Sequence, residues 1–262
     1  SAASDVYKRQ QQLGVSVLQV PSLEEITSGR ARINALRPIA IEELLGRDAV
    51  PPHPQLLGPG ITGRVLCITG AGGSIGSELC RQILQHKPEG LVLLESSEPA
   101  LYAIHQELRS RLPSGVELHP VLANATDAQQ LEEVLSRHGV QVVFHAAAYK
   151  HVPLVEANPL AGLANNVFGT RSVCSAASRT GVEQVVLIST DKAVRPTNVM
   201  GASKRVAELV VQGFAEQAER QAASSRFAMV RFGNVLGSSG SVVPLFRQQI
   251  AAGGPITLTH PE

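Results

Sequence analysis

A glycine-rich segment between an apolar run and a helical pattern constrains most strongly what this chain can fold into. The apolar run at residues 64–69 (RVLCIT) is typical of a buried strand, residues 70–76 (GAGGSIG) follow directly, and a helical pattern begins at Ser77. Gly70, Gly73 and Gly76 permit a tight turn, close approach of a pyrophosphate and close packing of the helix on the strand. The helix N-terminus offers N–H groups and a favourable dipole to phosphates. The segment predicts a dinucleotide site, although a glycine-rich turn alone can also be only a turn.

Strand and helix patterns alternate through the rest of the chain. Strand patterns occur at residues 64–69, 91–94, 116–122, 141–145, 185–188 and 227–231, with helical patterns at 77–85, 102–112, 128–138, 159–180 and from Met200 onward. This alternation predicts βαβ units and an α/β fold, a Rossmann-type doubly wound parallel sheet. After Gly233 the chain is predicted to be loop-rich, and a C-terminal substrate lobe is expected to be incomplete at Glu262.

The N-terminal quarter has a different character. Residues 1–10 are polar and are interpreted as a leader, and residues 11–60 as an upstream-domain remnant and linker arm, with short strands at 15–21 and 30–41. Residues 50–60 (VPPHPQLLGPG) have the proline and glycine content of a linker. Residues 61–262 are expected to form the NAD-binding domain with the start of the substrate lobe.

Charge and cysteine content exclude several classes of function. A net charge of +1, without basic runs, argues against nucleic acid and anionic membrane surfaces as partners. No apolar run reaches the roughly 18 residues that span a bilayer, and no secretory signal is visible. The three cysteines lie far apart in apolar patterns, so we expect buried free thiols, no metal site and a cytoplasmic location.

An acid at the end of the second strand supports the dinucleotide interpretation. Glu95 lies 19 residues beyond Gly76, where a carboxylate can accept hydrogen bonds from the adenosine ribose hydroxyls. A 2′-phosphate would be repelled there, so NAD is predicted in preference to NADP. The alternative is a solvated acid at a strand end.

A second group of functional side chains follows the fifth strand. Thr190, Asp191 and Lys192 come directly after its apolar run, and Met200 and Lys204 lie one helical turn apart at the start of the next helix. Ligands bind outside the carboxyl ends of strands in such sheets, so chemistry is expected here. The alternative for Asp191 and Lys192 is a surface turn with ordinary charges.

Three longer motifs resemble a known family. Residues 145–159 (HAAAYKHVPLVEANP), 189–204 (STDKAVRPTNVMGASK) and 231–246 (RFGNVLGSSGSVVPLF) are similar to the polysaccharide-biosynthesis branch of the extended short-chain dehydrogenase/reductases, over roughly residues 20–262. Within it the chain resembles UDP-N-acetylglucosamine 4,6-dehydratases, some members of which are membrane-anchored. The resemblance implies a carbon–oxygen lyase for surface polysaccharide or lipopolysaccharide synthesis, on the cytoplasmic face of the inner membrane, acting as a homo-oligomer.

The resemblance also implies a reaction and residue roles. The sugar C4 hydroxyl is oxidised, water is eliminated across C5 and C6, and the hydride returns to C6, which gives a 4-keto-6-deoxy sugar nucleotide. Asp191 matches the acid and Lys192 the base, which requires burial to raise one pKa and lower the other. Thr190 matches the hydroxyl of the family triad, with Ser189 as the next candidate, and Lys204 matches the lysine that binds the nicotinamide ribose.

The expected sites can be stated in full. The catalytic residues expected are Thr190, Asp191, Lys192, Met200 and Lys204. The cofactor-binding residues expected are Gly70, Gly73, Ser74, Ile75, Gly76, Glu95, Asn124, Ala125, Ala146, Ala147, Ala148, Lys150, Asn166 and Lys204. The substrate-binding residues expected are His151, Asn234, Ser241 and Val242. Asn124 stands where the family often has an aspartate for the adenine amine, and its side-chain oxygen can still accept a hydrogen bond.

Met200 stands where most extended family members have the tyrosine that takes the hydroxyl proton. A thioether has no proton to exchange. Either Asp191 deprotonates the C4 hydroxyl and then serves as the acid, as the resemblance to a Met-containing, C5-configuration-retaining subgroup favours, or the chain is a non-catalytic NAD-binding module. A nucleotide-sugar C4 epimerase is a third possibility, but epimerisation needs no C5 base and so leaves Lys192 unexplained.

Overall fold

The computed structural model describes residues 18–19, 37–38, 53–235 and 242–257, and the chain divides into two compact units, Ser1–Pro52 and His53–Glu262. In the first unit, β1 (Leu18–Gln19) pairs antiparallel with β2 (Arg37–Pro38), so that Leu18 lies opposite Pro38. Both strands fall within the strands predicted at residues 15–21 and 30–41. The predicted leader at residues 1–10 lies outside the described residues.

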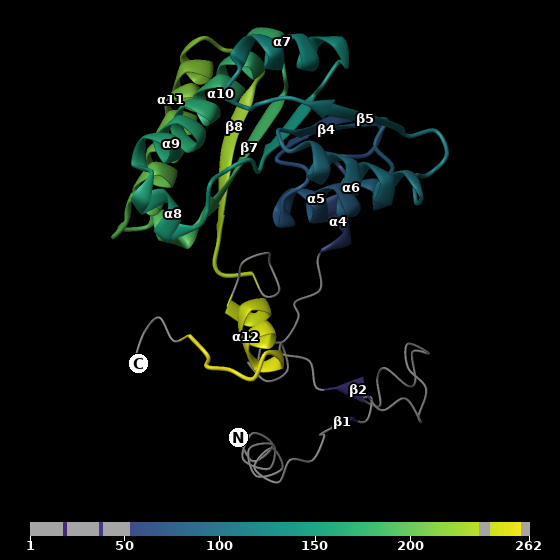
Figure 1. The fold of residues 1–262 in the computed structure, drawn as a ribbon. Coiled ribbons are helices and arrows are strands. Elements are labelled where there is room, and N and C mark those ends of the chain that lie inside the picture. The colour runs from purple at the N-terminus through teal and green to yellow at the C-terminus, as the bar shows by residue number, and fades with distance from the viewer. Residues whose placement is uncertain (1–17, 20–36, 39–52, 236–241, 258–262) are drawn as a thin grey trace. The chain divides into compact units, whose positions relative to one another are not determined.

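The second unit is built on a six-stranded parallel sheet (Figure 1). Its strands are β3 (Val65–Thr69), β4 (Gly90–Glu95), β5 (Glu117–Leu122), β6 (Val142–His145), β7 (Gln184–Thr190) and β8 (Arg226–Phe232). Their order across the sheet is β5-β4-β3-β6-β7-β8, and every neighbouring pair is parallel. This order reverses direction between β3 and β6, which is the arrangement of a doubly wound Rossmann sheet. The predicted fold class is confirmed.

Helices lie on both faces of this sheet. The helices described in this unit are α4 (Pro54–Leu57), α5 (Ser74–Gln85), α6 (Glu98–Arg109), α7 (Ala128–Arg137), α8 (Val152–Ala157), α9 (Pro159–Leu163), α10 (Gly169–Thr180), α11 (Val199–Arg220) and α12 (Val242–Ala251), with a 3-10 turn η2 (Asp191–Ala193) after β7. One face of the sheet is covered by α5 and α6, and the other by α7, α10 and α11 (Figure 1).

The core explains why the central strands read as continuous apolar runs. In β3, Leu66 and Ile68 pack with α5 and α6, whereas Cys67 between them packs with the helices of the opposite face. In β4, Leu91 and Leu93 pack with the same helices as Leu66, whereas Val92 and Leu94 pack with the helices of the opposite face. Successive side chains of a strand point to opposite faces, so a strand covered on both sides needs apolar residues throughout.

Four local features differ from the sequence prediction. Helix α5 begins at Ser74, inside the predicted glycine-rich turn. The single helix predicted at residues 159–180 is divided by a π-helical segment, η1 (Ala164–Phe168), which holds Asn166. Part of the region predicted to be loop-rich after Gly233 is helix α12. Its apolar residues Val242, Leu245 and Phe246 recur at the three- and four-residue spacing of a helix. Helix α8 was not predicted.

The remaining compositional predictions concern thiols, metals and membranes. Cys67, Cys80 and Cys174 are buried free thiols, as predicted, and burial raises the pKa of Cys67 to about 12. Within the described ranges no group of histidine, cysteine and acidic residues is arranged to hold a metal ion. No helix among the described residues is long and apolar enough to cross a membrane.

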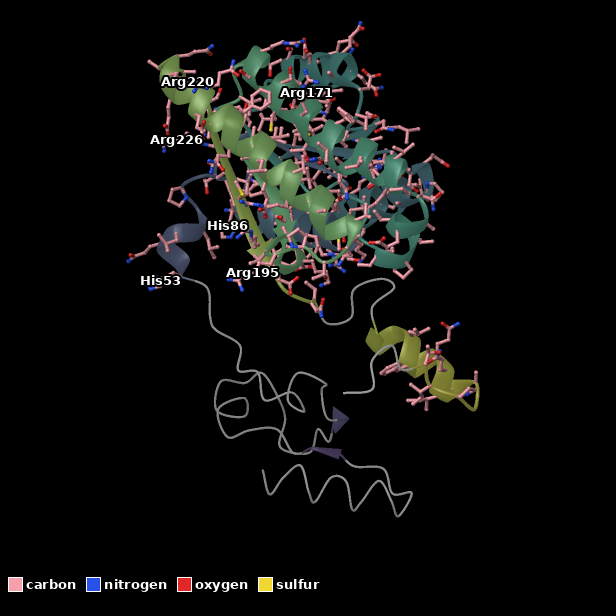
Figure 2. All side chains as sticks on the ribbon, turned by 90° about the vertical axis from the view of Figure 1, so that its left-hand side faces the viewer. His53, His86, Arg171, Arg195, Arg220 and Arg226 are labelled. Carbon is pink, nitrogen blue, oxygen red and sulfur yellow. The ribbon has the colours of Figure 1, made fainter. Side chains whose placement is uncertain are left out.

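The functional side chains expected from the sequence follow β3, β6, β7 and β8, whose carboxyl ends lie at one edge of the sheet. Figure 2 marks this polarity: Arg195, beyond β7, lies at one end of the domain, and Arg220 and Arg226, between α11 and β8, lie at the other. The candidate site therefore has to be built from the loops near Arg195.

Candidate functional site

Two adjoining cavities lie over the carboxyl edge of the sheet. The first, of about 520 Å³, lies between the start of α5 and helices α8 and α9, and the second, of about 260 Å³, lies over the end of β7 and the start of α11. Both are lined by Ile75, Ala146, Ala148, Tyr149, Lys150 and His151. Because six residues are common to both, we treat the two cavities as one cleft and refer to it as the cleft.

The glycine-rich turn forms one wall of the cleft, and two of its glycines are required by its shape. Gly70 has a φ of 68°, and a Cβ there would lie 2.7 Å from the Cα of Ala147. A Cβ on Gly76 would overlap the carbonyl oxygen of Gly70. The turn therefore packs backbone against backbone, which brings Ser74 and Ile75 to the cleft at the N-terminus of α5.

Glu95 is buried beside this turn at the end of β4. Its carboxylate accepts hydrogen bonds from the backbone N–H groups of Gly72 (3.0 Å), Ser96 (2.9 Å) and Ser97 (3.0 Å). It therefore links the glycine-rich turn to the loop after β4. The predicted contact with ribose hydroxyls stays a prediction, and the solvated strand-end alternative is wrong, since only 9% of the residue is exposed.

Asp191 and Lys192 form a polar pair in η2, of which Lys192 lines the cleft and Asp191 lies beside it. Lys192 Nζ lies 3.3 Å from Asp191 Oδ1 and donates to Asn234 Oδ1 (3.0 Å) in the loop after β8. The Thr190 hydroxyl donates to Asp191 Oδ1 (2.9 Å) and also accepts from the Lys192 N–H. These contacts bring together Thr190, Asp191, Lys192 and Asn234, from two strands that are adjacent in the sheet.

The expectation that burial raises the pKa of Asp191 is wrong. The Asp191 side chain is 53% exposed and that of Lys192 is 36% exposed. The hydrogen bond from Thr190 has the largest effect and lowers the pKa of Asp191. Partial burial opposes it, and the contact with Lys192 adds to the lowering. Asp191 is therefore ionised at neutral pH in this structure, and the two side chains form an ion pair.

Met200 and Lys204 line the same cleft from the first turns of α11, and both are buried. Lys204 Nζ donates to the carbonyl oxygen of Ile188 in β7 at 2.8 Å. Burial lowers the pKa of Lys204 to about 8, and the charge of Glu208 opposes this shift. The sequence prediction that these two residues share one face of a helix is confirmed, because both reach the cleft.

Asn166 supports the loop between β6 and α8 rather than lining the cleft. From the π-helical segment it accepts from the Tyr149 N–H (2.8 Å) and donates to the Tyr149 carbonyl (3.0 Å) and to Ser203 Oγ (2.9 Å). It is almost fully buried. This loop carries Lys150 and His151, so Asn166 fixes the wall that both parts of the cleft share.

The other expected residues are placed as follows. Ala146, Ala148, Lys150 and His151 line the cleft, and Ala147 closes on Gly70. Asn124 is exposed, and its Oδ1 accepts from the N–H (3.0 Å) and hydroxyl (2.9 Å) of Thr126 in a local turn. Ala125 is buried in the core. Ser241 lies outside the described residues, and Val242 is the first residue of α12.

Two buried polar groups near the site escaped the sequence analysis. Thr69 donates to His145 Nδ1 (2.6 Å), and His145 Nε2 donates to Thr170 Oγ1 (3.1 Å), because the Thr170 hydroxyl proton is used on the Asn166 carbonyl. The second group is Glu208, which is fully buried four residues after Lys204. That spacing places Glu208 on the face of α11 that touches β7, a signal that the sequence contains.

The comparisons with known proteins agree with this geometry. Residues 66–262 match the family described as polysaccharide biosynthesis protein. The chain is 45% identical over 249 residues to the capsular polysaccharide biosynthesis protein CapD of Staphylococcus aureus, an alignment that covers 95% of this chain and 41% of CapD. The chain therefore spans less than half the length of that relative.

Two further likenesses are relevant. The chain is 35% identical over 202 residues to a UDP-glucose 4-epimerase of Rickettsia canadensis, which covers 76% of this chain and 57% of the epimerase. The X-ray structure of Pen from Bacillus thuringiensis superposes with a TM-score of 0.71 at 32% identity, over 77% of this chain and 61% of that one. Both alignments cover about three quarters of this chain.

Proposed function

This chain belongs to the polysaccharide biosynthesis protein family of extended short-chain dehydrogenase/reductases, and from that premise we propose that it contains the cofactor site and catalytic centre of a nucleotide-sugar 4,6-dehydratase. The substrate we propose is UDP-N-acetylglucosamine, and the product is a UDP-4-keto-6-deoxy sugar for surface polysaccharide synthesis. The name of the CapD relative, a capsular polysaccharide biosynthesis protein, supports this assignment.

The residues of the glycine-rich turn fit a dinucleotide. The N-terminus of α5 has Gly73 as its cap and no capping side chain, so its first N–H groups are suited to a pyrophosphate. Glu95 adjoins the turn and suits ribose hydroxyls rather than a 2′-phosphate, which favours NAD over NADP. When bound there, NAD would supply reversible hydride transfer to and from the sugar.

The single observation that supports dehydration is the pairing of Asp191 with Lys192, which lines the cleft and donates to Asn234. An elimination across C5 and C6 needs a base for the C5 proton and an acid for the C6 hydroxyl. We assign the base to Lys192 and the acid to Asp191. In the ion pair Asp191 is deprotonated and Lys192 protonated, so each has to change its protonation state before it acts in the assigned role.

Asp191 has two successive proton-transfer roles in this reaction. It is ionised at neutral pH, so it can accept the C4 hydroxyl proton, a task that the thioether of Met200 cannot perform. The protonated Asp191 then gives this proton to the departing C6 hydroxyl, which leaves as water. Lys192 first gives its ammonium proton to solvent; the neutral amine then takes the C5 proton and returns it to C5 when C6 is reduced.

Lys204 and Thr190 assist from the two sides of the cleft. The Lys204 ammonium is buried and held on the Ile188 carbonyl, so its charge is poised to stabilise negative charge that develops on the sugar oxygen. The Thr190 hydroxyl, bound to Asp191, keeps that carboxylate oriented. Lys150 and His151, which line both parts of the cleft, are the proposed contacts to the nucleotide sugar.

The proposal is tested by incubating the full-length protein with UDP-N-acetylglucosamine and measuring the alkaline absorbance of a 4-keto sugar. We expect the wild type to give this absorbance and Lys192→Met to lose it while still binding NAD, because the methionine keeps the side-chain length but cannot take a proton. Wild-type protein that binds NAD and leaves the sugar unchanged would refute the dehydratase.

A C4 epimerase is the second candidate, favoured by the likeness to a protein named UDP-glucose 4-epimerase. An epimerase shares the cofactor and the substrate class but returns the hydride to C4. It would retain full activity in the Lys192→Met protein, because no proton leaves C5. The same variant therefore distinguishes the two functions.

A further inference from the structure

Glu208 is a fully buried carboxylate that joins three elements behind the candidate site. It extends from α11 and accepts hydrogen bonds from Ser189 Oγ in β7 (2.6 Å), from Arg231 Nε (2.7 Å) and Nη2 (2.6 Å) in β8, and from Arg205 Nη1 (3.0 Å). Both carboxylate oxygens therefore have two hydrogen bonds each. Burial would raise the pKa of Glu208, but the hydrogen bonds from Arg231, Ser189 and Arg205 outweigh it and bring the pKa to about 2.

A structural role alone explains this arrangement poorly. A buried charge costs free energy even when it is well paired, and a packed apolar side chain often stabilises a fold equally well. Arg231 and Arg205 are both about two-fifths exposed, so each could be solvated without Glu208. Buried ionic groups are, however, well suited to fixing one geometry among several.

Glu208 contacts the two strands whose ends carry Asp191, Lys192 and Asn234 of the candidate site. Ser189 lies two residues before Asp191, and Arg231 lies three residues before Asn234. Glu208 therefore joins β7 and β8 just below the point where Lys192 and Asn234 meet at 3.0 Å. The two segments are joined in three ways: by the backbone pairing that sets Ser189 opposite Arg231, by Glu208, and by the contact of Lys192 with Asn234.

Lys204 provides a second contact between α11 and β7, from the same face of the helix as Glu208. It lies one turn before Glu208 and binds the carbonyl of Ile188, the residue next to Ser189. Helix α11 thus holds two successive residues of β7, one through its backbone and one through its side chain. The end of β7 has little freedom to move against α11 while both contacts persist.

We propose that Glu208 is a positioning residue, which sets the placement of the Asp191–Lys192 pair relative to Asn234 by holding Ser189 and Arg231 together. The catalytic role of the pair that Glu208 positions rests on the proposed function. Loss of the carboxylate charge should leave the glycine-rich turn unchanged, because no contact of Glu208 reaches that turn.

The test compares wild type, Glu208→Gln and Ser189→Ala in the full-length protein. For Glu208→Gln we expect kcat to fall about tenfold to a hundredfold, the scale on which small misplacements of catalytic groups act. KM and the Kd of NAD should change less than about twofold. Hydrogen–deuterium exchange should increase at residues 190–193 and 232–235 and stay constant at residues 70–76.

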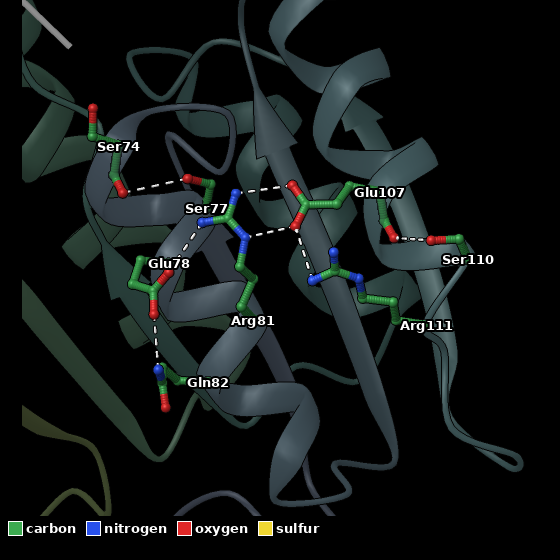
Figure 3. Close-up of polar contacts among 8 residues, drawn as sticks. All are labelled: Ser74, Ser77, Glu78, Arg81, Gln82, Glu107, Ser110 and Arg111. Carbon is green, nitrogen blue, oxygen red and sulfur yellow. Dashed lines mark hydrogen bonds and ion pairs between the residues drawn. The ribbon is translucent and has the colours of Figure 1, made fainter. Parts of the chain in front are cut away.

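Glu107→Gln is the matched control, because Glu107 forms the same kind of bidentate pair elsewhere in the domain. It accepts from Arg81 Nε (2.7 Å) and Nη2 (2.9 Å) between α5 and α6, beside Glu78 and Arg111 (Figure 3). None of these four residues lines the cleft. We expect the control to leave kcat and the exchange at residues 190–193 unchanged.

The outcomes separate this proposal from the proposed function. If the wild type converts no nucleotide sugar, the dehydratase fails, and the exchange at residues 190–193 and 232–235 still decides the role of Glu208. Glu208→Gln with wild-type kcat and unchanged exchange overturns the positioning role, as does a loss shared equally with Glu107→Gln. If Glu208→Gln does not fold, Ser189→Ala, which removes only one contact, must show the same pattern, and a wild-type result there overturns the proposal.

Discussion

Lys204 is the buried cation of the site, and its protonation sets a pH limit. Its pKa of about 8 means that the ammonium is charged at neutral pH and becomes neutral above about pH 8. Because the proposed role needs the positive charge, we predict that kcat is constant up to about pH 7 and falls as the pH rises through 8. The measurement is a pH–rate profile with saturating substrate, and a constant kcat up to pH 9.5 would contradict the role.

Asp191 is assigned both the C4 hydroxyl proton and the acid step, so its removal should stop the reaction at its first stage. We predict that Asp191→Asn reduces bound NAD at least about a hundredfold more slowly on mixing with substrate. Absorbance of the reduced nicotinamide in a single turnover measures this. Intact reduction without product would show that another group deprotonates the C4 hydroxyl.

The site residues illustrate which properties the sequence could predict. Their presence at the carboxyl ends of β3, β6, β7 and β8 followed from the strand pattern, because parallel strands end at one edge of a sheet. The electrostatic state of Asp191 did not follow, since it depends on the Thr190 hydroxyl and on an exposure that periodicity does not encode. The partner of Ser189 is 19 residues away and is visible only once β7 packs on α11.

At the scale of elements, the start of α11 packs closely against η2 because residue 201 is a glycine. A Cβ on Gly201 would overlap the carbonyl oxygen of Lys192, and Asn198 Oδ1, which caps the helix through the Gly201 N–H at 2.7 Å, lies close by. Lys192 is therefore placed partly by the close approach of these two backbones.

We predict that Gly201→Ala lowers kcat about tenfold or more and lowers the free energy of unfolding by about 1–3 kcal/mol, the usual cost of overpacking. Gly213→Ala in the same helix is the control. Nothing lies within 4 Å of a Cβ at that position, so this variant should keep full activity and gain up to about 1 kcal/mol of stability. Kinetics and chemical denaturation measure both effects, and equal behaviour of the two variants would contradict the account.

The elements also show where sequence patterns fail. A period of 3.6 residues predicts one helix over residues 159–180. The π-helical segment at Ala164–Phe168 continues the helix but changes the direction in which its side chains point. That shift directs Asn166 toward the backbone of Tyr149 and toward Ser203. The central strands were predicted well because both of their faces are buried, which leaves an unambiguous apolar run.

At the scale of the whole molecule, buried His145 makes folding sensitive to acid. Burial lowers the pKa of His145 to about 3, and the charge of Lys204 adds to this effect. The unfolded chain takes up a proton below about pH 6.5, whereas the folded protein does not until about pH 3. This contribution to stability is therefore complete above pH 6.5 and is lost progressively as the pH falls toward 3.

We predict that the free energy of unfolding decreases between pH 6.5 and 5 with a slope that approaches about 1.4 kcal/mol per pH unit for this histidine. His145→Gln should flatten that slope. His53→Gln is the control, because His53 is exposed at the start of the domain and is marked in Figure 2. Denaturant titrations across this pH range measure the effect, and an unchanged slope in His145→Gln would refute it.

The central claim for the molecule is that a Rossmann domain with an Asp191–Lys192 pair removes water from a nucleotide sugar. The most direct test is the mass of the product after the full-length protein has acted on UDP-N-acetylglucosamine in the presence of NAD. We expect a product lighter than the substrate by one water, and no such product from Lys192→Met. A product of unchanged mass that differs only in configuration at C4 would contradict it.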